Sequence, residues 1–191
     1  MPGEWDPNQV ICPSLELQYP CFFNWHQDDV EDVRIADLRH FPAQVGTALM
    51  EPGGWTIVGL PTNFYAHAPA HELTGPVLGK EARVRFIPIR YFWDYGDGAT
   101  AVKNVPGTTW KAQRLAEFSS TPTSHVYRRL ETVRVRLSIE YAAAYRWAGS
   151  EWMPVIGTLT LRANDLITVV AGAETVLVDQ TCLENAAGPG C

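Results

Sequence analysis

The sequence predicts an all-β protein in which two sheets pack into a sandwich. Three observations favour this class: the chain holds 15 Gly and 14 Pro, apolar residues make up 46% against 19% charged, and one long segment alternates apolar with polar side chains. Short strands separated by Gly and Pro turns are typical of sandwiches and barrels. A chain of 191 residues is also long enough to bury a sizeable core.

Residues 1–50 are predicted to form an irregular arm. The arm's aromatic residues follow no strand or helix period, and prolines recur through it. Such a segment gains order only by docking, so we interpret it as a docking or assembly segment. Within it, a short strand is predicted at 33–35 and a single helical turn at 37–41, which ends before Pro42.

Residues 51–180 are predicted to form the sandwich itself, and residues 181–191 a short C-terminal tail. The turn residues at 51–54 mark the start of the sandwich. Pro88 implies a bulge or an edge position in the strand that contains it, because proline cannot donate to a β-ladder. Apolar segments bounded by turn residues predict strands at 55–60, 62–67, 83–93, 132–141, 158–162, 166–170 and 175–178.

The segment 132–141 carries the clearest pattern in the sequence. Its side chains alternate between apolar and polar over the whole length, which predicts a half-buried strand. The apolar set is Val133, Val135, Leu137, Ile139 and Tyr141, and the polar set is Arg134, Arg136, Ser138 and Glu140.

A tight turn is predicted at Trp93-Asp94-Tyr95-Gly96-Asp97-Gly98, directly after an aromatic strand. Glycine tolerates positive φ there, and aspartate can accept hydrogen bonds from the turn amides. Downstream, His125-Val126-Tyr127 precedes the alternating strand. This combination resembles the PKD family, whose members carry a Trp-Asp-Phe-Gly-Asp-Gly turn, then His-x-Tyr, then a strand of alternating Val and Thr. Tyr95 stands in place of the Phe.

The resemblance covers about residues 52–180 and implies an immunoglobulin-like, PKD-type two-sheet sandwich. Within the family, the chain is most similar to a group of exported actinobacterial proteins, through residues 54–64 and 177–182. It departs from the family pattern in the long stretch 99–124 between the turn and His125, and in lacking a Gly shortly after Tyr127. These departures concern the loops around the turn.

The turn motif is interpreted as structural. Trp93 is expected to point between the sheets, and Asp94 and Asp97 to satisfy turn amides. Tyr127 is expected to act as a corner tyrosine whose hydroxyl returns to the backbone just upstream. A calcium role for the two carboxylates is the alternative, but Ca²⁺ takes roughly six to eight oxygen ligands and no third acidic residue lies near in sequence. We therefore expect no metal site.

Four cysteines lie in two equally spaced pairs near the chain ends, Cys12 with Cys21 and Cys182 with Cys191. The spacing fits neither a zinc knuckle nor a Cys-x-x-Cys redox site. Disulfides are predicted, and they indicate an oxidising compartment, so that the protein is expected to be secreted or part of the cell envelope. Two local loops are the favoured pairing; pairing between the ends and four unpaired thiols are the alternatives.

Charge and motifs exclude several function classes. A net charge of −6 disfavours nucleic acid and anionic membranes as partners, because both need a concentrated basic surface. No apolar run is long enough to span a bilayer. Neither a nucleophile elbow nor a phosphate-binding glycine loop is present. We expect no enzyme activity and no cofactor.

Four aromatic residues are candidates for binding. Trp110 and Phe118 lie in the long loop 99–124, which is expected to carry specificity and to hold a helix at 110–118 capped by Thr108 or Thr109. Trp147 and Trp152 flank a turn, and they form either a cross-strand pair or an exposed platform for sugar.

The sequence thus favours a non-catalytic extracellular or cell-envelope module for protein interaction or assembly, such as a subunit of a surface polymer or an adhesin. One version of this hypothesis has the arm adding a strand to a neighbour's sheet edge. A carbohydrate-binding module that uses exposed Trp residues is the alternative hypothesis.

Overall fold

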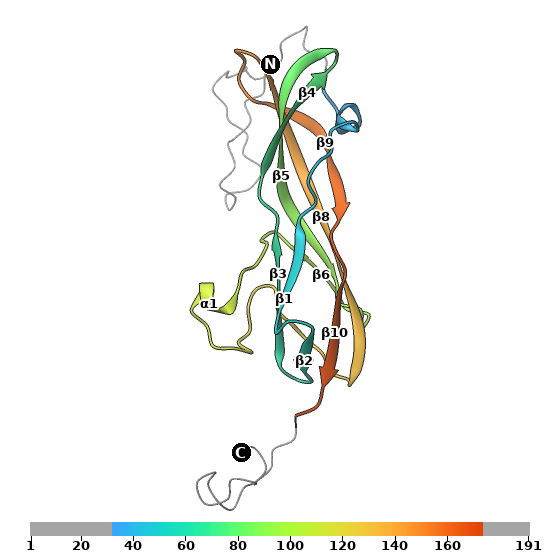
Figure 1. The fold of residues 1–191 in the computed structure, drawn as a ribbon, viewed down its shortest axis with the longest axis vertical. Coiled ribbons are helices and arrows are strands. Elements are labelled where there is room, and N and C mark those ends of the chain that lie inside the picture. Colours follow the sequence, from blue (N-terminus) through green and yellow to red (C-terminus); the bar gives the residue numbers. More distant parts are fainter. Residues whose placement is uncertain (1–31, 174–191) are drawn as a thin grey trace, which may run out of the picture. The chain divides into compact units, whose positions relative to one another are not determined.

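A computed structural model describes residues 32–173, and the chain is all-β over this range (Figure 1). The described strands form two sheets. The smaller sheet has the order β1-β3-β7, with β1 at Thr47–Glu51, β3 at Pro61–His67 and β7 at His125–Val126. The larger sheet has the order β2-β10-β8-β5-β4, and β6 and β9 pair with β5 and β8. Its strands are β2 (Trp55–Ile57), β4 (His71–Val77), β5 (Lys80–Asp94), β6 (Thr100–Lys103), β8 (Glu131–Trp147), β9 (Met153–Arg162) and β10 (Leu166–Ala171).

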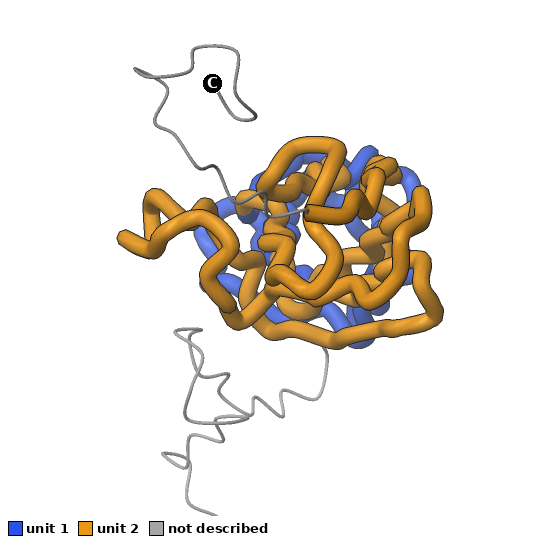
Figure 2. The backbone as a smooth tube through the Cα atoms, turned by 90° about the horizontal axis from the view of Figure 1, so that it is seen from below, with its two compact units in different colours: residues 1–43, 70–87, 142–159 blue, residues 44–69, 88–141, 160–191 orange. Residues whose placement is uncertain are grey.

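The described residues form two compact units, coloured separately in Figure 2. Unit 1 comprises residues 32–43, 70–87 and 142–159, and unit 2 comprises residues 44–69, 88–141 and 160–173. In unit 1, β4 pairs antiparallel with the first half of β5 in the register His71↔Phe86. The core of unit 1 includes Val33, Leu38, Phe41, Val84 and Phe86.

Unit 2 has its own apolar core and most of the strand pairings. β10 runs antiparallel to β8 and parallel to β2, with Val169 opposite Trp55. In the smaller sheet, β3 lies between β1 and β7 and is antiparallel to both. The core of unit 2 includes Phe64, Trp93, Tyr127, Val135, Leu137 and Ile139.

The alternating segment behaves as its pattern predicts except at Glu140. Every apolar residue of the set at 132–141 is buried, and Arg134 and Arg136 are exposed. Glu140 of the polar set is also buried, and it forms an ion pair with Arg90. The strand is longer than predicted, because β8 continues to Trp147 through a stretch of Ala and Tyr residues. Alternation is lost in that stretch, so the sequence pattern ended before the strand did.

The segment before residue 51 departs from the predicted arm. β1 was not predicted, yet Ala48 and Met50 are buried and strand β1 pairs with β3. Of the strand predicted at 33–35, a single parallel bridge between Arg34 and Ile156 forms. The helical turn predicted at 37–41 is a 3₁₀ helix at Ile35–Leu38, and Val33 and Leu38 on either side of it are buried. Residues 33–50 are thus folded, not an irregular arm.

The edge of β1 is occupied by a side chain. Asn164 Oδ1 accepts a hydrogen bond from Ala48 N–H at 2.8 Å, and Asn164 Nδ2 donates to Ala48 C=O at 3.2 Å. β1 is the terminal strand of the smaller sheet. The amide group of Asn164 therefore pairs with Ala48 as a neighbouring strand would.

Strands β4 and β6 were also absent from the prediction. β4 contains Gly75 and Pro76, both of which lower strand propensity. Proline is tolerated because β4 is the terminal strand of its sheet. Glycine is required because a Cβ at position 75 would lie 2.9 Å from Phe41 Cε1.

Several other predictions are either compared with the structure here or concern residues that it does not describe. The predicted strand at 55–60 is only Trp55–Ile57, and the predicted helix at 110–118 is only α1, Trp110–Gln113. β5 runs through Pro88 as one strand. Pro88 lies between the end of the pairing with β4, at Phe86, and the start of the pairing with β6, at Tyr91, in agreement with the predicted edge position. The strand predicted at 175–178 and all four cysteines lie outside the described residues. Between residues 32 and 173, the structure contains no helix with the length and apolar character to cross a membrane.

Candidate interaction surface

The turn at 93–98 closes with its own carboxylates, as expected. Asp94 Oδ1 accepts a hydrogen bond from Gly96 N–H at 3.0 Å, and Asp97 Oδ1 accepts one from Ala99 N–H at 3.0 Å. Gly96 and Gly98 have φ of 83° and 93°, which side-chain-bearing residues rarely adopt. Asp94 Oδ2 also lies 3.2 Å from Arg136 Nη1, so each oxygen of this carboxylate has a protein partner.

His125 and Tyr127 pack onto this turn. His125 Nε2 lies 2.7 Å from Asp97 Oδ2, and its ring stacks on Tyr95 with centroids 4.1 Å apart. The Tyr127 hydroxyl donates to the carbonyl of Tyr95 at 3.0 Å. The hydroxyl was expected to return to backbone just upstream; instead it reaches the turn motif itself. The two motifs of the sequence are therefore one structural cluster.

The tyrosines of this cluster remain neutral. Burial and, to a smaller extent, the charge of Asp97 together raise the pKa of Tyr95 to about 12. Burial raises the pKa of Tyr127 even more strongly. A neutral Tyr127 can therefore donate its hydrogen bond to Tyr95 over the whole physiological range.

The contact between Asp97 and His125 gives a pH-dependent stability. Partial burial of the Asp97 carboxylate raises its pKa, but hydrogen bonds from His125 and Ala99 outweigh this, so the pKa lies below its ordinary value of 3.8. A lowered pKa in the folded state contributes stability above the ordinary value, and this stability is lost as the pH falls through the folded pKa. We expect Asp97→Asn to destabilise the protein at pH 6 and to make little difference near pH 2.

Urea unfolding of the wild type and of Asp97→Asn between pH 2 and pH 6 measures this difference. Asp37→Asn is a control, because Asp37 also accepts a backbone hydrogen bond, at Arg34 N–H, but has no histidine partner among the described residues. A constant difference between wild type and Asp97→Asn across the range would contradict the assignment.

A buried polar network anchors the long loop to unit 2. The Glu51 carboxylate accepts hydrogen bonds from Asn63 Nδ2 at 3.0 Å and from Trp110 N–H at 2.8 Å. The Asn63 side chain also donates to Thr108 C=O and accepts from the Thr121 hydroxyl, each at 2.8 Å. Thr109 caps α1, as one of the two predicted caps. The loop is thus fixed at both of its ends.

The anchored loop positions Trp110 and Phe118 differently. Trp110 is only 4% exposed, and its Nε1 donates to Ser119 C=O at 2.9 Å, so its ring is part of the loop's interior. Phe118 packs on Trp110 at 5.6 Å and on Trp55 at 6.1 Å between ring centroids. Phe118 therefore extends the loop's aromatic cluster to the half-exposed indole of Trp55.

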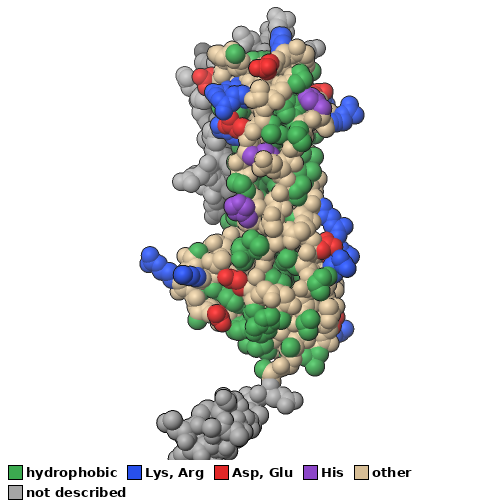
Figure 3. Space-filling model, in the orientation of Figure 1, with side chains coloured by type: hydrophobic (Ala, Val, Ile, Leu, Met, Phe, Trp, Pro, Cys, Tyr) green, Lys and Arg blue, Asp and Glu red, His purple; other side chains and the backbone are tan. Residues whose placement is uncertain are grey.

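An exposed group of apolar side chains continues from Trp55 onto β10. Thr56, Thr168 and Val170 point inward and are buried, so their neighbours on the two strands point outward. Trp55 is 46% exposed, Ile167 48% and Val169 49%. We call Trp55, Phe118, Ile167 and Val169 the apolar face; in Figure 3, hydrophobic side chains gather over β2 and β10.

Sequence reasoning found Phe118 but missed the other members of the apolar face. The signal was present in 166–170, where apolar residues occupy every position except Thr168. On β8, in contrast, the outward positions carry Arg134 and Arg136. A strand that is apolar on both faces is either covered by other elements on both sides or exposes an apolar surface. β10 exposes an apolar surface.

Trp147 and Trp152 lie in unit 1, at the ends of β8 and β9. They do not form the predicted cross-strand pair: Trp147 packs on Tyr145 at 5.0 Å, with Lys80 Nζ 5.3 Å from its ring centroid. The guanidinium groups of Arg85 and Arg146 lie 4.2 Å and 4.9 Å from the centroid of Trp152. Both indoles are therefore already engaged in aromatic and cation–π contacts.

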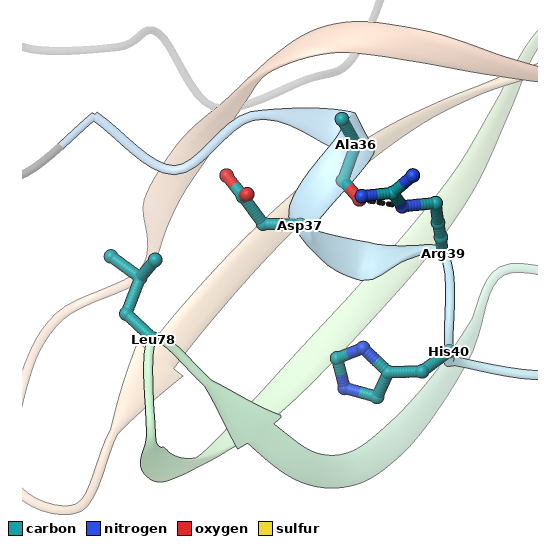
Figure 4. Close-up of a pocket in the computed structure, with 5 residues that line it drawn as sticks. All are labelled: Ala36, Asp37, Arg39, His40 and Leu78. Carbon is teal, nitrogen blue, oxygen red and sulfur yellow. Dashed lines mark hydrogen bonds between the residues drawn. The ribbon is translucent and has the colours of Figure 1, made fainter.

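A shallow hollow in unit 1 is lined by the 3₁₀ helix and Leu78 (Figure 4). Its polar groups hold the local backbone: Asp37 Oδ2 accepts from Arg34 N–H, Arg39 Nε donates to Ala36 C=O, and His40 Nε2 lies 2.8 Å from Pro76 C=O. The polar side chains that line this hollow are thus already hydrogen-bonded to the backbone around it.

Within residues 32–173, no group of three or more His, Cys, Asp and Glu side chains is arranged to hold a metal ion.

The fold and the surface define an all-β protein with two sheets and an exposed apolar face on its larger sheet. No family model, no curated protein and no solved structure matches this chain.

Proposed function

We propose that this protein is a non-catalytic interaction module that acts outside the cytosol and binds another protein through the apolar face. The observation that carries the proposal is the exposure of three large apolar side chains, Trp55, Ile167 and Val169, on adjacent strands. Burying such side chains at an interface gains roughly 25 cal/mol per Å² of apolar area. Contiguous apolar surface that stays exposed is typical of an interaction site.

The neighbouring strand supports this assignment by contrast. In the β8–β10 register, Ile167 lies opposite Arg134, and Val169 lies opposite Thr132. Arg134 forms an ion pair with Asp165 at 3.0 Å, so β8 presents a polar, solvated surface beside the apolar one. An apolar centre bordered by polar groups resembles the anatomy of protein interfaces.

The His125–Asp97 pair supports a structural role over a catalytic one. Tyr95 stacks on the imidazole and Tyr127 packs edge-on against it, with centroids 4.7 Å apart. The imidazole ring of His125 is thus enclosed by the turn that it stabilises.

A PKD-type sandwich and export from the cytosol remain parts of this proposal, supported by the turn motif and the cysteine pattern of the sequence.

Introducing a negative charge into the apolar face tests the proposal. We expect Val169→Glu to weaken capture of partners from secreted and cell-surface fractions at least tenfold, because a carboxylate would have to be buried unpaired. Ile156→Glu is the matched control, since Ile156 is a strand residue of unit 1 with 48% exposure. Circular dichroism verifies that both variants fold.

Equal capture by wild type and Val169→Glu would contradict the proposal.

Carbohydrate binding is the second candidate, favoured by the half-exposed indole of Trp55 beside Phe118. In that case Trp55→Ala would abolish retention on polysaccharide, because stacking on an aromatic ring supplies the affinity.

A further inference from the structure

The charges of the chain are sharply divided along the sequence. All 15 Lys and Arg lie between residues 32 and 173, together with 12 of the 21 Asp and Glu. Residues 1–31 carry no Lys or Arg and six acidic residues: Glu4, Asp6, Glu16, Asp28, Asp29 and Glu31. The negative net charge of the protein thus comes from its ends, and the described region has a net positive charge.

Part of this positive charge has no carboxylate partner among the described residues and lies in the loop that carries Phe118. Lys111 and Arg114 are exposed in the segment that follows Trp110, whose ring contacts Phe118. Neither side chain has a carboxylate partner among residues 32–173, and Glu117 is the nearest acidic residue in sequence. The loop that contributes Phe118 to the apolar face therefore also carries two exposed cations.

A second pair of cations, Arg128 and Arg129, follows Tyr127 in the sequence. Tyr127 C=O accepts a hydrogen bond from Gly59 N–H, just after the end of β2, the strand that carries Trp55. Both arginines are exposed and form no ion pair with any described residue. In contrast, Arg90, Arg134, Arg136 and Arg162 of the same unit each have a carboxylate partner.

The N-terminal segment has the complementary chemistry. Besides its six acids, residues 1–31 contain Trp5, Tyr19, Phe22, Phe23 and Trp25. Aromatic side chains dominate the buried centres of interfaces, and acidic residues at the rim pair with cations on the partner. The apolar face and the two pairs of cations match this combination.

We propose that residues 1–31 of a second copy of this chain occupy the apolar face, with their acidic residues beside Lys111, Arg114, Arg128 and Arg129. This inference rests on the proposed function and names the partner. Because the donor segment and the acceptor face are different surfaces, the contact is heterologous, and it repeats from copy to copy unless a ring closes. Self-association should weaken as salt screens the charges.

Zero-length carbodiimide coupling of carboxylates to lysine amines tests the proposal on the full chain. The protein has only three lysines, Lys80 in unit 1 and Lys103 and Lys111 in unit 2, so the site of coupling is unambiguous. With equal amounts of ¹⁴N- and ¹⁵N-labelled protein, we expect mixed-label cross-links between residues 1–31 and Lys111. We expect their yield to exceed that at Lys80 at least fivefold.

Charge reversal gives the matched control. Arg128→Glu should lower the mixed-label yield at Lys111 and the sedimentation-detected self-association at least fivefold, whereas Lys80→Glu should leave both unchanged. Absent cross-links at Lys111, cross-links within one copy only, or equal yields at Lys80 would each overturn the inference. If one of these occurs while Val169→Glu still loses a captured partner, this inference fails and the proposed function stands.

Discussion

Replacing Trp93 with Ala is expected to lower the free energy of unfolding by about 3–5 kcal/mol. Trp93 is only 1% exposed, packs on Phe64 at 5.5 Å and lies parallel to Tyr95. The loss combines the transfer free energy of the indole with the cavity that it leaves. Its Nε1 has no hydrogen-bond partner among the described residues, so truncation leaves no donor or acceptor unpaired.

Urea unfolding followed by circular dichroism measures this effect, and Trp55→Ala is its control. Both variants delete an indole, but Trp55 is half exposed, so we expect its loss to cost less than about 1 kcal/mol. Equal destabilisation by the two substitutions would show that Trp93 does not hold the core of unit 2. The pair also separates a structural tryptophan from a member of the interaction surface.

Gly96→Ala is the second substitution with a large expected effect. A Cβ at position 96 would lie 2.6 Å from Arg134 C=O and 3.1 Å from Arg134 N, which are backbone atoms of β8 and cannot move aside. The φ of 83° adds strain of about 1–3 kcal/mol for a residue with a side chain. Together with the overlap, which typically costs about 1–3 kcal/mol, a loss of roughly 3 kcal/mol or more is expected.

Gly98→Ala separates the two causes. Gly98 also has positive φ, but no atom lies within 4 Å of a Cβ built there. Thermal unfolding should therefore place Gly98→Ala between the wild type and Gly96→Ala. If the two variants unfold at the same temperature, close approach of the turn to β8 is not what requires glycine at position 96.

The sequence predicted the elements in which local pattern and tertiary environment agree. Strand β8 has one buried and one solvated face, so its period of two is visible along residues 132–141. The turn at 93–98 was predictable because the conformational needs of glycine and aspartate are local. The buried position of Trp93 and the roles of Asp94 and Asp97 in the turn could therefore be anticipated.

Elements whose stability comes from distant neighbours could not be predicted in the same way. β4 holds Gly75 because Phe41 lies against it, and this contact joins residues far apart in sequence. β1 is short, and its burial depends on pairing with β3. Propensity alone gives no indication of either strand.

The apolar face was only partly predictable for a related reason. Phe118 was identified through the length of its loop, whereas Trp55 and Val169 appeared as ordinary strand residues. Whether an apolar strand residue is covered depends on the sheet's other layer and not on its own sequence neighbours. Trp110 shows the opposite case, because the loop folds over it and buries a ring that the sequence offered as a binding residue.

The pairing of Asn164 with Ala48 affects how copies of this protein can associate. An exposed edge strand can pair with other chains through its backbone, and such pairing leads to uncontrolled fibril formation. The Asn164 carboxamide satisfies both the amide hydrogen and the carbonyl of Ala48, so an incoming backbone cannot pair with this residue of β1. At this point of the sheet, a second molecule can associate only through side-chain contacts and not by adding a strand.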